Sequence, residues 1–443
     1  MKITNKLLCG AAFAAMASTA SASDLCDTPS AMGDLGSFEG DVVTLAGSMQ
    51  GKDEENLMAM ASCFEKATGA VIKYSGSRDF AALIVADLRS NNAPNIAIFP
   101  QPGLAADMAA DGFLSPLGDD AAAWMTENYG AGASWVALGT YAGPDGTEQF
   151  YGFPFKQDLK SLVWYSPEQF EDNGYETPAT MEELIALSDQ MVADGNTPWC
   201  IGVESGNATG WTATDWMEDL MLRTTTPENY DRWVSNDLPF NSPEVIKAME
   251  IYGQFSRNDA YVAGGASSVA TTFFGDAPKG LFSTPASCMM HRQASFIPAF
   301  FPNKGEEVAN GEADFFYFPP FESMDLGNPV LGAGTLYTIT NDSPATRAFV
   351  DYLQEARAHE VWMSQGSFLT AHKGANPSAY ASPAQAKQGE ILTSATTFRF
   401  DASDLMPGAI GAGAFWSEMT AFANGQDAQT TADNIQSAWD AIK

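Results

Sequence analysis

Histidines are scarce in this chain, and the few present do not suggest a metal site. Only His291, His359 and His372 occur among the 443 residues, and no two of them have the spacing of zinc ligands. The sequence also lacks the Gly-x-Ser-x-Gly turn of many serine hydrolases, a phosphate loop ending in Lys-Ser or Lys-Thr, and the glycine fingerprint of dinucleotide-binding folds. We therefore expect no metal, no cofactor and none of these catalytic chemistries.

Basic residues are also few. Lysine and arginine together number 22 against 55 aspartates and glutamates, which gives a net charge of −33 at pH 7. The acidic residues are spread along the chain, so most of them are expected at the solvated surface. Such a charge argues against nucleic acid and against anionic membranes as partners.

Long hydrophobic runs are absent beyond the amino terminus. Lys2 and Lys6 precede an apolar stretch over residues 7–17 and a small-residue site at 20–22, a pattern typical of a secretory signal peptide cleaved after Ala22. No later stretch is apolar for long enough to cross a bilayer. We expect residues 1–22 to be a signal peptide and the rest of the chain to be exported to the periplasm, soluble and not inserted in a membrane.

Cysteine is the next rare residue. Four of the five cysteines follow the predicted signal peptide: Cys26, Cys63, Cys200 and Cys288. An even number of cysteines in an oxidising compartment favours two disulfides. Spacing alone leaves all three pairings open, and buried free thiols are the alternative.

Strands and helices alternate along the chain. Short apolar strands are predicted at 42–47, 70–76 and 95–100, and segments with apolar residues at helical spacing connect them, which is the order of a parallel sheet with right-handed crossovers. Further helix starts are predicted by serine followed by proline, and by one capping-box pair, at Ser166, Ser242, Ser343, Ser382 and Thr180 with Glu183. The fold class is α/β, and a chain of this length holds about two domains.

Three loops follow the predicted strands at the edge where parallel sheets bind ligands. They span 47–50, 75–79 and 100–103, and each is small and polar enough to approach a ligand closely. Ser77 and Asp79 also stand where a side chain would cap the following helix, which is the alternative interpretation of either residue.

Several longer stretches resemble one known family. They are FEKATGAVIKYSGSRDF, NNAPNIAIFPQPGLAADMAADGFLSPL, YGFPFKQDLKSLVWYSPEQF, GNATGWTATDWMEDLMLR, KGLFSTPASCMMHRQASF and LGAGTLYTITNDSPATRAFVDYL. Over these stretches the chain is similar to the extracellular solute-binding proteins, family 1, of sugar ABC transporters, the maltose-binding-protein group, and most similar to their alpha-glucoside-binding branch. The resemblance implies a periplasmic, monomeric, non-enzymatic protein that captures an alpha-glucoside or a similar di- or oligosaccharide and delivers it to membrane permease subunits.

The resemblance also implies the two-lobed periplasmic binding protein fold of class II type, with a ligand cleft between lobes joined by three crossing segments. The crossings would lie near 153–157, 282–286 and 332–336. The lobes would then be 41–153 plus 286–332 at the amino-terminal side, and 157–282 plus 336–443 at the carboxy-terminal side.

This implied arrangement explains a cluster of polar residues in an otherwise apolar region. Lys156, Gln157 and Asp158 would be polar because they line the cleft. The arrangement also implies the disulfide pairing, with Cys63 near the place where residue 26 packs, and with the segments around Cys200 and Cys288 both flanking the second crossing. We expect Cys26–Cys63 and Cys200–Cys288.

A sugar has hydroxyls on its rim and apolar C–H faces, so its site needs both polar and aromatic side chains. The polar candidates near the implied cleft are Gln50, Ser77, Arg78, Asp79, Gln101, Lys156, Asp158, Asp215 and Gln293. The stacking candidates are Trp164, Trp211, Trp216 and Trp416. The alternatives are a salt-bridged surface strand for Asp158 and a place in the core for Trp164 and Trp216.

Two other functions fit parts of the sequence. A glycoside hydrolase needs paired carboxylates, which Asp158 with Glu204 or Asp215 would supply, although the pattern of the whole chain is that of a binding protein. An aromatic cleft also suits a quaternary ammonium such as a betaine. The many amide, carboxylate and lysine candidates favour a polyhydroxyl ligand.

Overall fold

The computed structural model describes residues 25–26, 30–130, 132–395 and 397–442. The predicted signal peptide at 1–22 lies outside the described residues.

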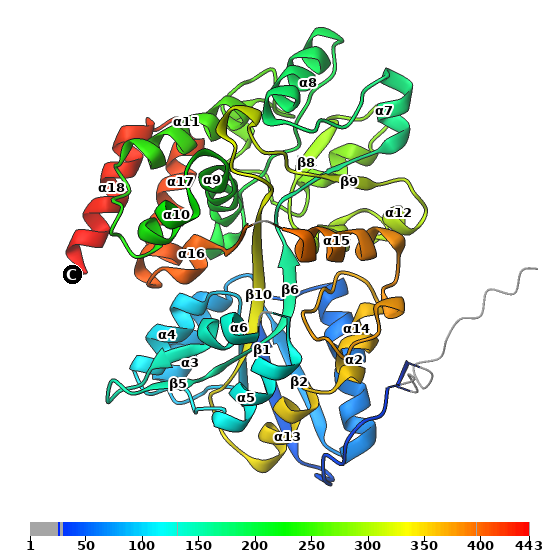
Figure 1. Ribbon diagram of the computed structural model, residues 1–443, viewed down its shortest axis with the longest axis vertical. Coiled ribbons are helices and arrows are strands. Elements are labelled where there is room, and N and C mark those ends of the chain that lie inside the picture. Colours follow the sequence, from blue (N-terminus) through cyan, green and yellow to red (C-terminus); the bar gives the residue numbers. More distant parts are fainter. Residues whose placement is uncertain (1–24, 27–29, 131, 396, 443) are drawn as a thin grey trace, which may run out of the picture.

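The chain forms two lobes, one above the other in Figure 1. Two long strands, β6 (Gly152–Leu159) and β10 (Pro329–Ile339), run between the lobes and pair with each other in antiparallel fashion. The predicted two-lobed α/β fold is confirmed, and the polar stretch that includes Lys156 does lie at the junction of the lobes.

The first lobe, the lower one in Figure 1, is built on the strands β10-β3-β1-β2 of a sheet, to which β6 is joined through β10. The same sheet continues into the second lobe through β11, which pairs with the first residues of β10. β1 is parallel to both β2 and β3, as the alternating pattern predicts. The strands are β1 (Val42–Gly47), β2 (Val71–Gly76), β3 (Ile96–Phe99), and the small pair β4 (Thr140–Ala142) and β5 (Glu148–Phe150). The helices are α2 (Lys52–Thr68), α3 (Phe80–Arg89), α4 (Pro102–Ala110), α5 (Asp119–Asn128), α6 (Gly132–Leu138), α13 (Pro344–Tyr352) and α14 (Ala356–Met363).

The second lobe contains a smaller antiparallel sheet of order β8-β7-β9 surrounded by helices. The strands are β7 (Leu162–Tyr165), β8 (Met290–Arg292), β9 (Asp314–Tyr317) and, at the end of β10, β11 (Thr397–Phe400). The helices are α7 (Pro167–Asn173), α8 (Met181–Ala193), α9 (Trp211–Thr224), α10 (Pro227–Val234), α11 (Pro243–Ser256), α12 (Glu306–Ala309), α15 (Pro383–Ser394), α16 (Ala402–Leu405), the π-helix η7 (Ala409–Phe415), α17 (Trp416–Ala423) and α18 (Ala428–Ala441).

Two of the predicted lobe boundaries are wrong. Residues 286–332 were expected in the first lobe, but they supply β8 and β9, which both hydrogen-bond to β7 in the second lobe. Residues 336–363 were expected in the second lobe, but Phe349 on α13 packs edge to face on Phe64 of α2, with ring centroids 5.2 Å apart. Strand pairing and core packing, both long-range, decide these assignments.

One predicted crossing is wrong for the same reason. The segment near 282–286 does not connect the lobes, because η3 (Ala277–Phe282) before it and β8 after it both belong to the second lobe. Besides β6 and β10, the chain passes between the lobes along the segment between α14 and α15. Tyr380 on this segment contacts the cores of both lobes.

The pairing of β6 with β10 contains a β-bulge. Thr335 lies opposite Lys156 and Leu336 lies opposite Pro154, so Phe155 has no partner in the ladder. Phe155 lies in the first-lobe core and Leu159 in a second-lobe core, and the strand between them passes the junction of the lobes.

The local features predicted from short motifs are present. α7, α11, α13 and α15 each begin with proline after serine, although only Ser343 and Ser382 accept the capping hydrogen bond from the backbone. Thr180 and Glu183 form the predicted capping box at α8. The disulfides pair Cys26 with Cys63 and Cys200 with Cys288, as expected.

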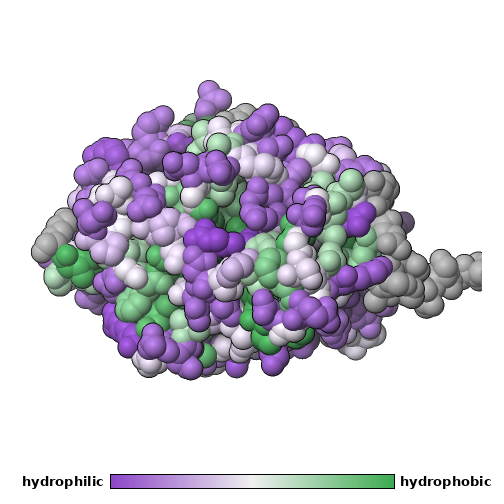
Figure 2. Space-filling model, turned by 90° about the horizontal axis from the view of Figure 1, so that it is seen from below, coloured by the Kyte–Doolittle hydropathy of each residue, from purple (hydrophilic) through white to green (hydrophobic). Residues whose placement is uncertain are grey.

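Hydrophilic residues cover most of the face shown in Figure 2, with smaller hydrophobic patches between them. Within the described ranges, no helix has both the length and the apolar composition needed to cross a membrane.

Candidate functional site

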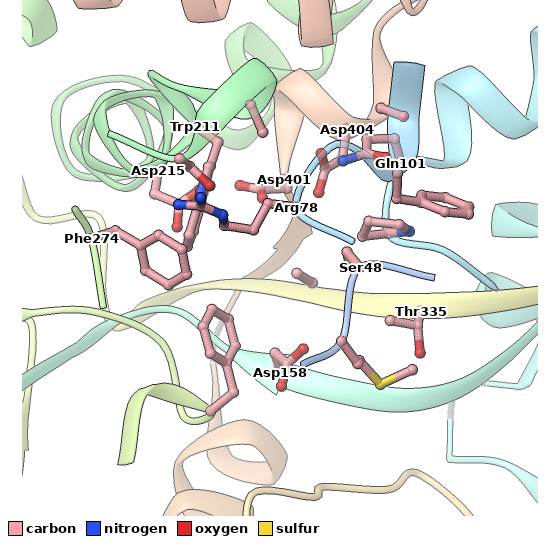
Figure 3. Close-up of a pocket in the computed structure, with 18 of the residues that line it drawn as sticks. Ser48, Arg78, Gln101, Asp158, Trp211, Asp215, Phe274, Thr335, Asp401 and Asp404 are labelled. Carbon is pink, nitrogen blue, oxygen red and sulfur yellow. The ribbon is translucent and has the colours of Figure 1, made fainter. Parts of the chain in front are cut away.

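A pocket with an empty volume of about 1090 Å³, including open solvent at its mouth, lies between the lobes. The first lobe contributes the loops after β1, β2 and β3, the second lobe contributes α9 and the segment after β11, and β6 and β10 pass beside both sets. Figure 3 shows side chains from all of these elements pointing toward the same space, including Ser48, Gln101, Asp158, Trp211 and Asp401.

Lys156, Asp158 and Asp53 form a buried charge group on one wall of this pocket. Lys156 is only 2% exposed, and its Nζ lies 2.9 Å from Asp158 Oδ1 and 3.3 Å from Asp53 Oδ2. Burial lowers the pKa of Lys156, but the two carboxylates outweigh burial and raise it above the usual value. Because all of β6 is buried, the salt-bridged surface strand considered for Asp158 is wrong, even though the ion pair itself exists.

A second group, around Lys160, is more acidic. Lys160 Nζ donates to Asp215 Oδ1 at 2.7 Å and also to Asp401, and Arg292 Nη1 lies 3.8 Å from Asp215 Oδ2. Carboxylate oxygens of Asp215, Glu218 and Asp401 all lie within 4.8 Å of one another. Three carboxylates this close would suit a metal ion, but here Lys160 supplies the positive charge between two of them.

Among the described residues, this group, which also includes Asp404, has fewer cations than carboxylates. Burial raises the pKa of Asp215 to about 7 and raises the pKa values of Glu218 and Asp404 well above their usual values. Burial opposes ionisation of Asp401 as well, but Lys160 beside it holds the pKa of that carboxyl below its usual value. Lys160 thus favours the ionised form of Asp401, whereas burial disfavours the ionised forms of Glu218 and Asp404.

Aromatic rings from the second lobe form the opposite wall. Trp211 packs edge to face on Phe274 with centroids 4.9 Å apart, and Phe296 lies 6.0 Å from Trp211. Lys160 Nζ lies 5.4 Å from the Trp211 ring centroid, and Lys156 Nζ lies 5.4 Å from that of Phe296. The wall thus offers apolar ring surface next to charged hydrogen-bond donors.

Several buried polar atoms around the pocket have no hydrogen-bond partner among the described residues. They are Asp53 Oδ1, Gln101 Oε1, Thr335 Oγ1, Asp215 Oδ2 and Trp416 Nε1. Most buried polar groups in folded proteins are paired, so an unpaired set around one cavity indicates that a polar molecule, a ligand or water, supplies the missing bonds.

Eight of the predicted site residues line the pocket. They are Gln50, Arg78, Gln101, Lys156, Asp158, Trp211, Asp215 and Trp416.

Trp164, Trp216 and Gln293 do not line the pocket. Trp164 is fully buried and donates its Nε1 hydrogen to the Gln293 carbonyl oxygen at 3.0 Å. Trp216 packs in the second-lobe core, 5.4 Å from Trp199 between ring centroids. The core alternative therefore holds for both tryptophans, and the Gln293 side chain accepts a bond from the backbone of Ala294 instead.

Ser77 and Asp79 also lie outside the pocket. Ser77 Oγ accepts a hydrogen bond from the Asp79 backbone N–H at 3.1 Å, which is a local turn contact. Asp79 makes no capping bond to α3. Its Oδ1 instead accepts the backbone N–H of Asn207, in the other lobe, at 3.0 Å.

Sequence reasoning missed important lining residues, among them Asp53, Lys160, Phe274, Thr335, Asp401 and Asp404. Lys160 has a detectable signal, because Lys156, Asp158 and Lys160 alternate along the strand and so share a face. Asp401 has none, because it reaches the pocket only after the four-residue strand β11 pairs with β10, far away in the sequence.

Comparison with known proteins matches this architecture. The family described as bacterial extracellular solute-binding protein matches residues 47–360. An alpha-glucosides-binding periplasmic protein of Rhizobium meliloti (strain 1021) is 56% identical over 407 residues, which are 92% of this chain and 88% of that protein. An osmoprotective compounds-binding protein of Synechocystis sp. (strain ATCC 27184 / PCC 6803 / Kazusa) is 42% identical over 90% of this chain and 92% of its own length.

A solved structure agrees in fold. The bacterial solute receptor AcbH, which is described as preferring β-D-galactopyranose, superposes with a TM-score of 0.76 at 18% identity. The superposition covers 91% of this chain and 99% of that one.

Proposed function

The chain belongs to the bacterial extracellular solute-binding protein family, and from this premise we propose that it is the periplasmic substrate-binding component of a carbohydrate ABC importer. Its ligand is an alpha-glucoside or a similar di- or oligosaccharide, as the name of its 56%-identical relative suggests. The bound sugar is handed to membrane permease subunits, and the protein acts as an exported monomer whose signal peptide is residues 1–22.

The observation that carries the proposal is the chemistry of the inter-lobe pocket. Unpaired acceptors on Gln101 and Thr335 and an unpaired donor on Trp416 match the hydroxyls on the rim of a sugar. The Trp211 and Phe296 rings match its C–H faces. An unmatched buried polar group costs about 1–3 kcal/mol, so the same set rejects ligands that lack the hydroxyls.

Capture requires contacts to both lobes. Gln101 extends from the loop after β3 in the first lobe, and Trp211 lies on α9 in the second. A ligand that touches both stabilises the arrangement in which the lobes lie together, because it binds that arrangement more tightly than one with the lobes apart. β6, β10 and the segment between α14 and α15 are the connections about which the lobes would rotate.

The carboxylates that could form the catalytic pair of a glycoside hydrolase already have ion-pair or hydrogen-bond partners within the protein. Asp158 is paired with Lys156, and Asp215 is paired with Lys160. Glu204 accepts the Gly206 backbone N–H at 2.7 Å and lies 3.7 Å from Arg78 Nη1. The relatives are binding proteins, and we propose that this chain is not an enzyme either.

A quaternary ammonium ligand fits the site less well than a sugar. Such ligands need aromatic faces free of other cations, but the ammonium groups of Lys160 and Lys156 already lie 5.4 Å from the Trp211 and Phe296 rings.

The test is a thermal-shift screen followed by calorimetry against a panel of alpha-glucosides, other disaccharides, betaine and choline. A ligand that binds only the folded protein raises its melting temperature by mass action. We expect stabilisation by at least one alpha-glucoside, none by the quaternary ammonium compounds, and no sugar cleaved. A panel without any stabilising sugar would reject the proposal.

A further inference from the structure

We propose that Asp79 and Asp107 form a latch, a pair of side chains that hold the two lobes together without touching the ligand. The inference rests on the proposed function, because it concerns the lobe closure by which a ligand is captured. Both aspartates belong to the first lobe, and each accepts a hydrogen bond from a backbone N–H of the second lobe.

Asp79 stands at the N-cap position of α3 but is not used as a cap. Its Oδ1 accepts the Asn207 N–H at 3.0 Å. The neighbouring Gly206 is what allows this approach, because a Cβ atom there would lie 2.8 Å from the same oxygen. An aspartate at a capping position that bonds across to the other lobe has a role outside its own helix.

Asp107 lies on α4, directly below α16 in Figure 1. Its Oδ2 accepts the Gly408 N–H at 2.9 Å. One turn earlier, Gly103 faces the Met406 carbonyl so closely that any side chain there would collide with it. Burial raises the pKa of Asp107, although the bond from Gly408 opposes this.

Neither aspartate lines the sugar pocket. Asp79, Asn207 and Gly408 instead line a neighbouring crevice of roughly 520 Å³, which shares Arg78, Ala81, Ala208 and Trp416 with the pocket. The contacts therefore exist only when the lobes are together and are the same for every ligand. They shift the equilibrium between open and closed forms and leave the choice of ligand to the pocket.

Elsewhere on the lobe interface, an exposed ion pair joins the lobes more weakly than the two latch hydrogen bonds do. Lys304 Nζ lies 3.0 Å from Glu55 Oε1, but both side chains are more than half exposed. Exposed ion pairs contribute little to stability, so we expect the latch residues, which bond to backbone donors, to contribute more to closure than this pair.

The test compares Asp79→Ala, Asp107→Ala and the double variant with the wild-type protein. Asp87→Ala is the matched control, because Asp87 lies on α3 and its side chain contacts Asn92 within the first lobe. Affinities for several binding sugars are measured by calorimetry, rates by stopped-flow fluorescence, and compactness by small-angle scattering. Each latch variant should lose roughly three- to ten-fold in affinity, by the same factor for every sugar, through faster release and not slower association.

Other outcomes overturn the latch. A loss that differs between sugars would place Asp79 or Asp107 in contact with the ligand, and unchanged affinity would remove any role in closure. If the wild-type protein binds no sugar, the proposed function fails, but the latch can still be tested by scattering. Variants as compact as the wild type would contradict the latch, and more open variants would support it.

Discussion

Lys156 Nζ lies 2.9 Å from Asp158 Oδ1 within a strand whose eight residues are all buried. The pair lines the pocket, so we expect it to contribute to both folding and binding. Asp158→Asn, which keeps the shape and removes the charge, should lower the free energy of unfolding by about 3 kcal/mol, because it leaves a buried ammonium with only Asp53 as a partner. Denaturant unfolding measures this loss.

The control for that change is the exposed pair of Lys279 and Asp276, 2.6 Å apart. Asp276→Asn should change stability by less than about 1 kcal/mol. Equal effects at the two sites would contradict the structural role of Asp158.

Trp211 should contribute apolar ring surface to sugar binding. Trp211→Phe keeps a ring and should retain most of the affinity, whereas Trp211→Ala should lose about 2 kcal/mol, or roughly thirty-fold. Calorimetry on both variants measures the difference, with Trp124→Phe in the first lobe as a control that leaves affinity unchanged. If Trp211→Ala binds like the wild type, the ring does not contact the ligand.

The raised pKa of Asp215, about 7 against an unfolded value of 3.8, predicts a dependence of stability on pH. Between these values the folded protein binds more protons than the unfolded chain, so this group makes the free energy of unfolding fall as pH rises, by about 1.4 kcal/mol per pH unit. Below pH 3.8 and above pH 7 its contribution is constant. Asp215→Asn removes this titration.

The measurement is the difference in unfolding free energy between the wild type and Asp215→Asn, followed from pH 4 to pH 8. We expect the unfolding free energy of the variant to rise relative to that of the wild type up to about pH 7. Above that pH the difference between the two should stay constant. A constant difference over the whole range would show that Asp215 titrates normally.

Gly103→Ala should impair closure of the lobes without lowering the stability of the unliganded protein. Alanine favours a helix by up to about 1 kcal/mol over glycine, so the unliganded protein should not lose stability. The new methyl group would collide with the Met406 carbonyl of the other lobe, so affinity should fall for all sugars and scattering should show less contraction on binding. Gly389→Ala on α15 is the control, because a Cβ atom there would lie 3.7 Å from the nearest other atom. Unchanged affinity in Gly103→Ala would contradict a close contact between the lobes at α4.

The two disulfides should differ in their contribution to stability. Cys26 and Cys63 are 37 residues apart, and Cys200 and Cys288 are 88 apart. If cross-links act by restricting the unfolded chain, the longer loop contributes about 0.8 kcal/mol more. Peptide mapping without reductant checks the pairing. Unfolding of two variants, each with both cysteines of one disulfide replaced by serine, checks which disulfide contributes more to stability.

The sequence predicted local structure well because the signals are local. Serine before proline marks the start of α7 or α13 wherever the helix later packs. The lobe assignment of 286–332 could not be predicted in the same way, because it depends on β8 pairing with β7 across more than a hundred residues.

The site was predictable where residues alternate on one strand, as Lys156 and Asp158 do on β6. Trp216 was misassigned because α9 is buried on nearly every side, so helical spacing does not distinguish the pocket face from the core face. Asp401 and Asp404 were missed because they reach the pocket only through the folded arrangement of β10 and β11.

The bulge at Phe155 has a mechanical consequence. A regular ladder between β6 and β10 would resist twisting, since each change of angle strains hydrogen bonds along its whole length. At the bulge the ladder is already interrupted, and the unpaired residue can absorb a change in φ and ψ without breaking another bond. If the lobes rotate during capture, we expect this interruption to be one place where β6 adjusts, and it lies next to Lys156, which lines the pocket.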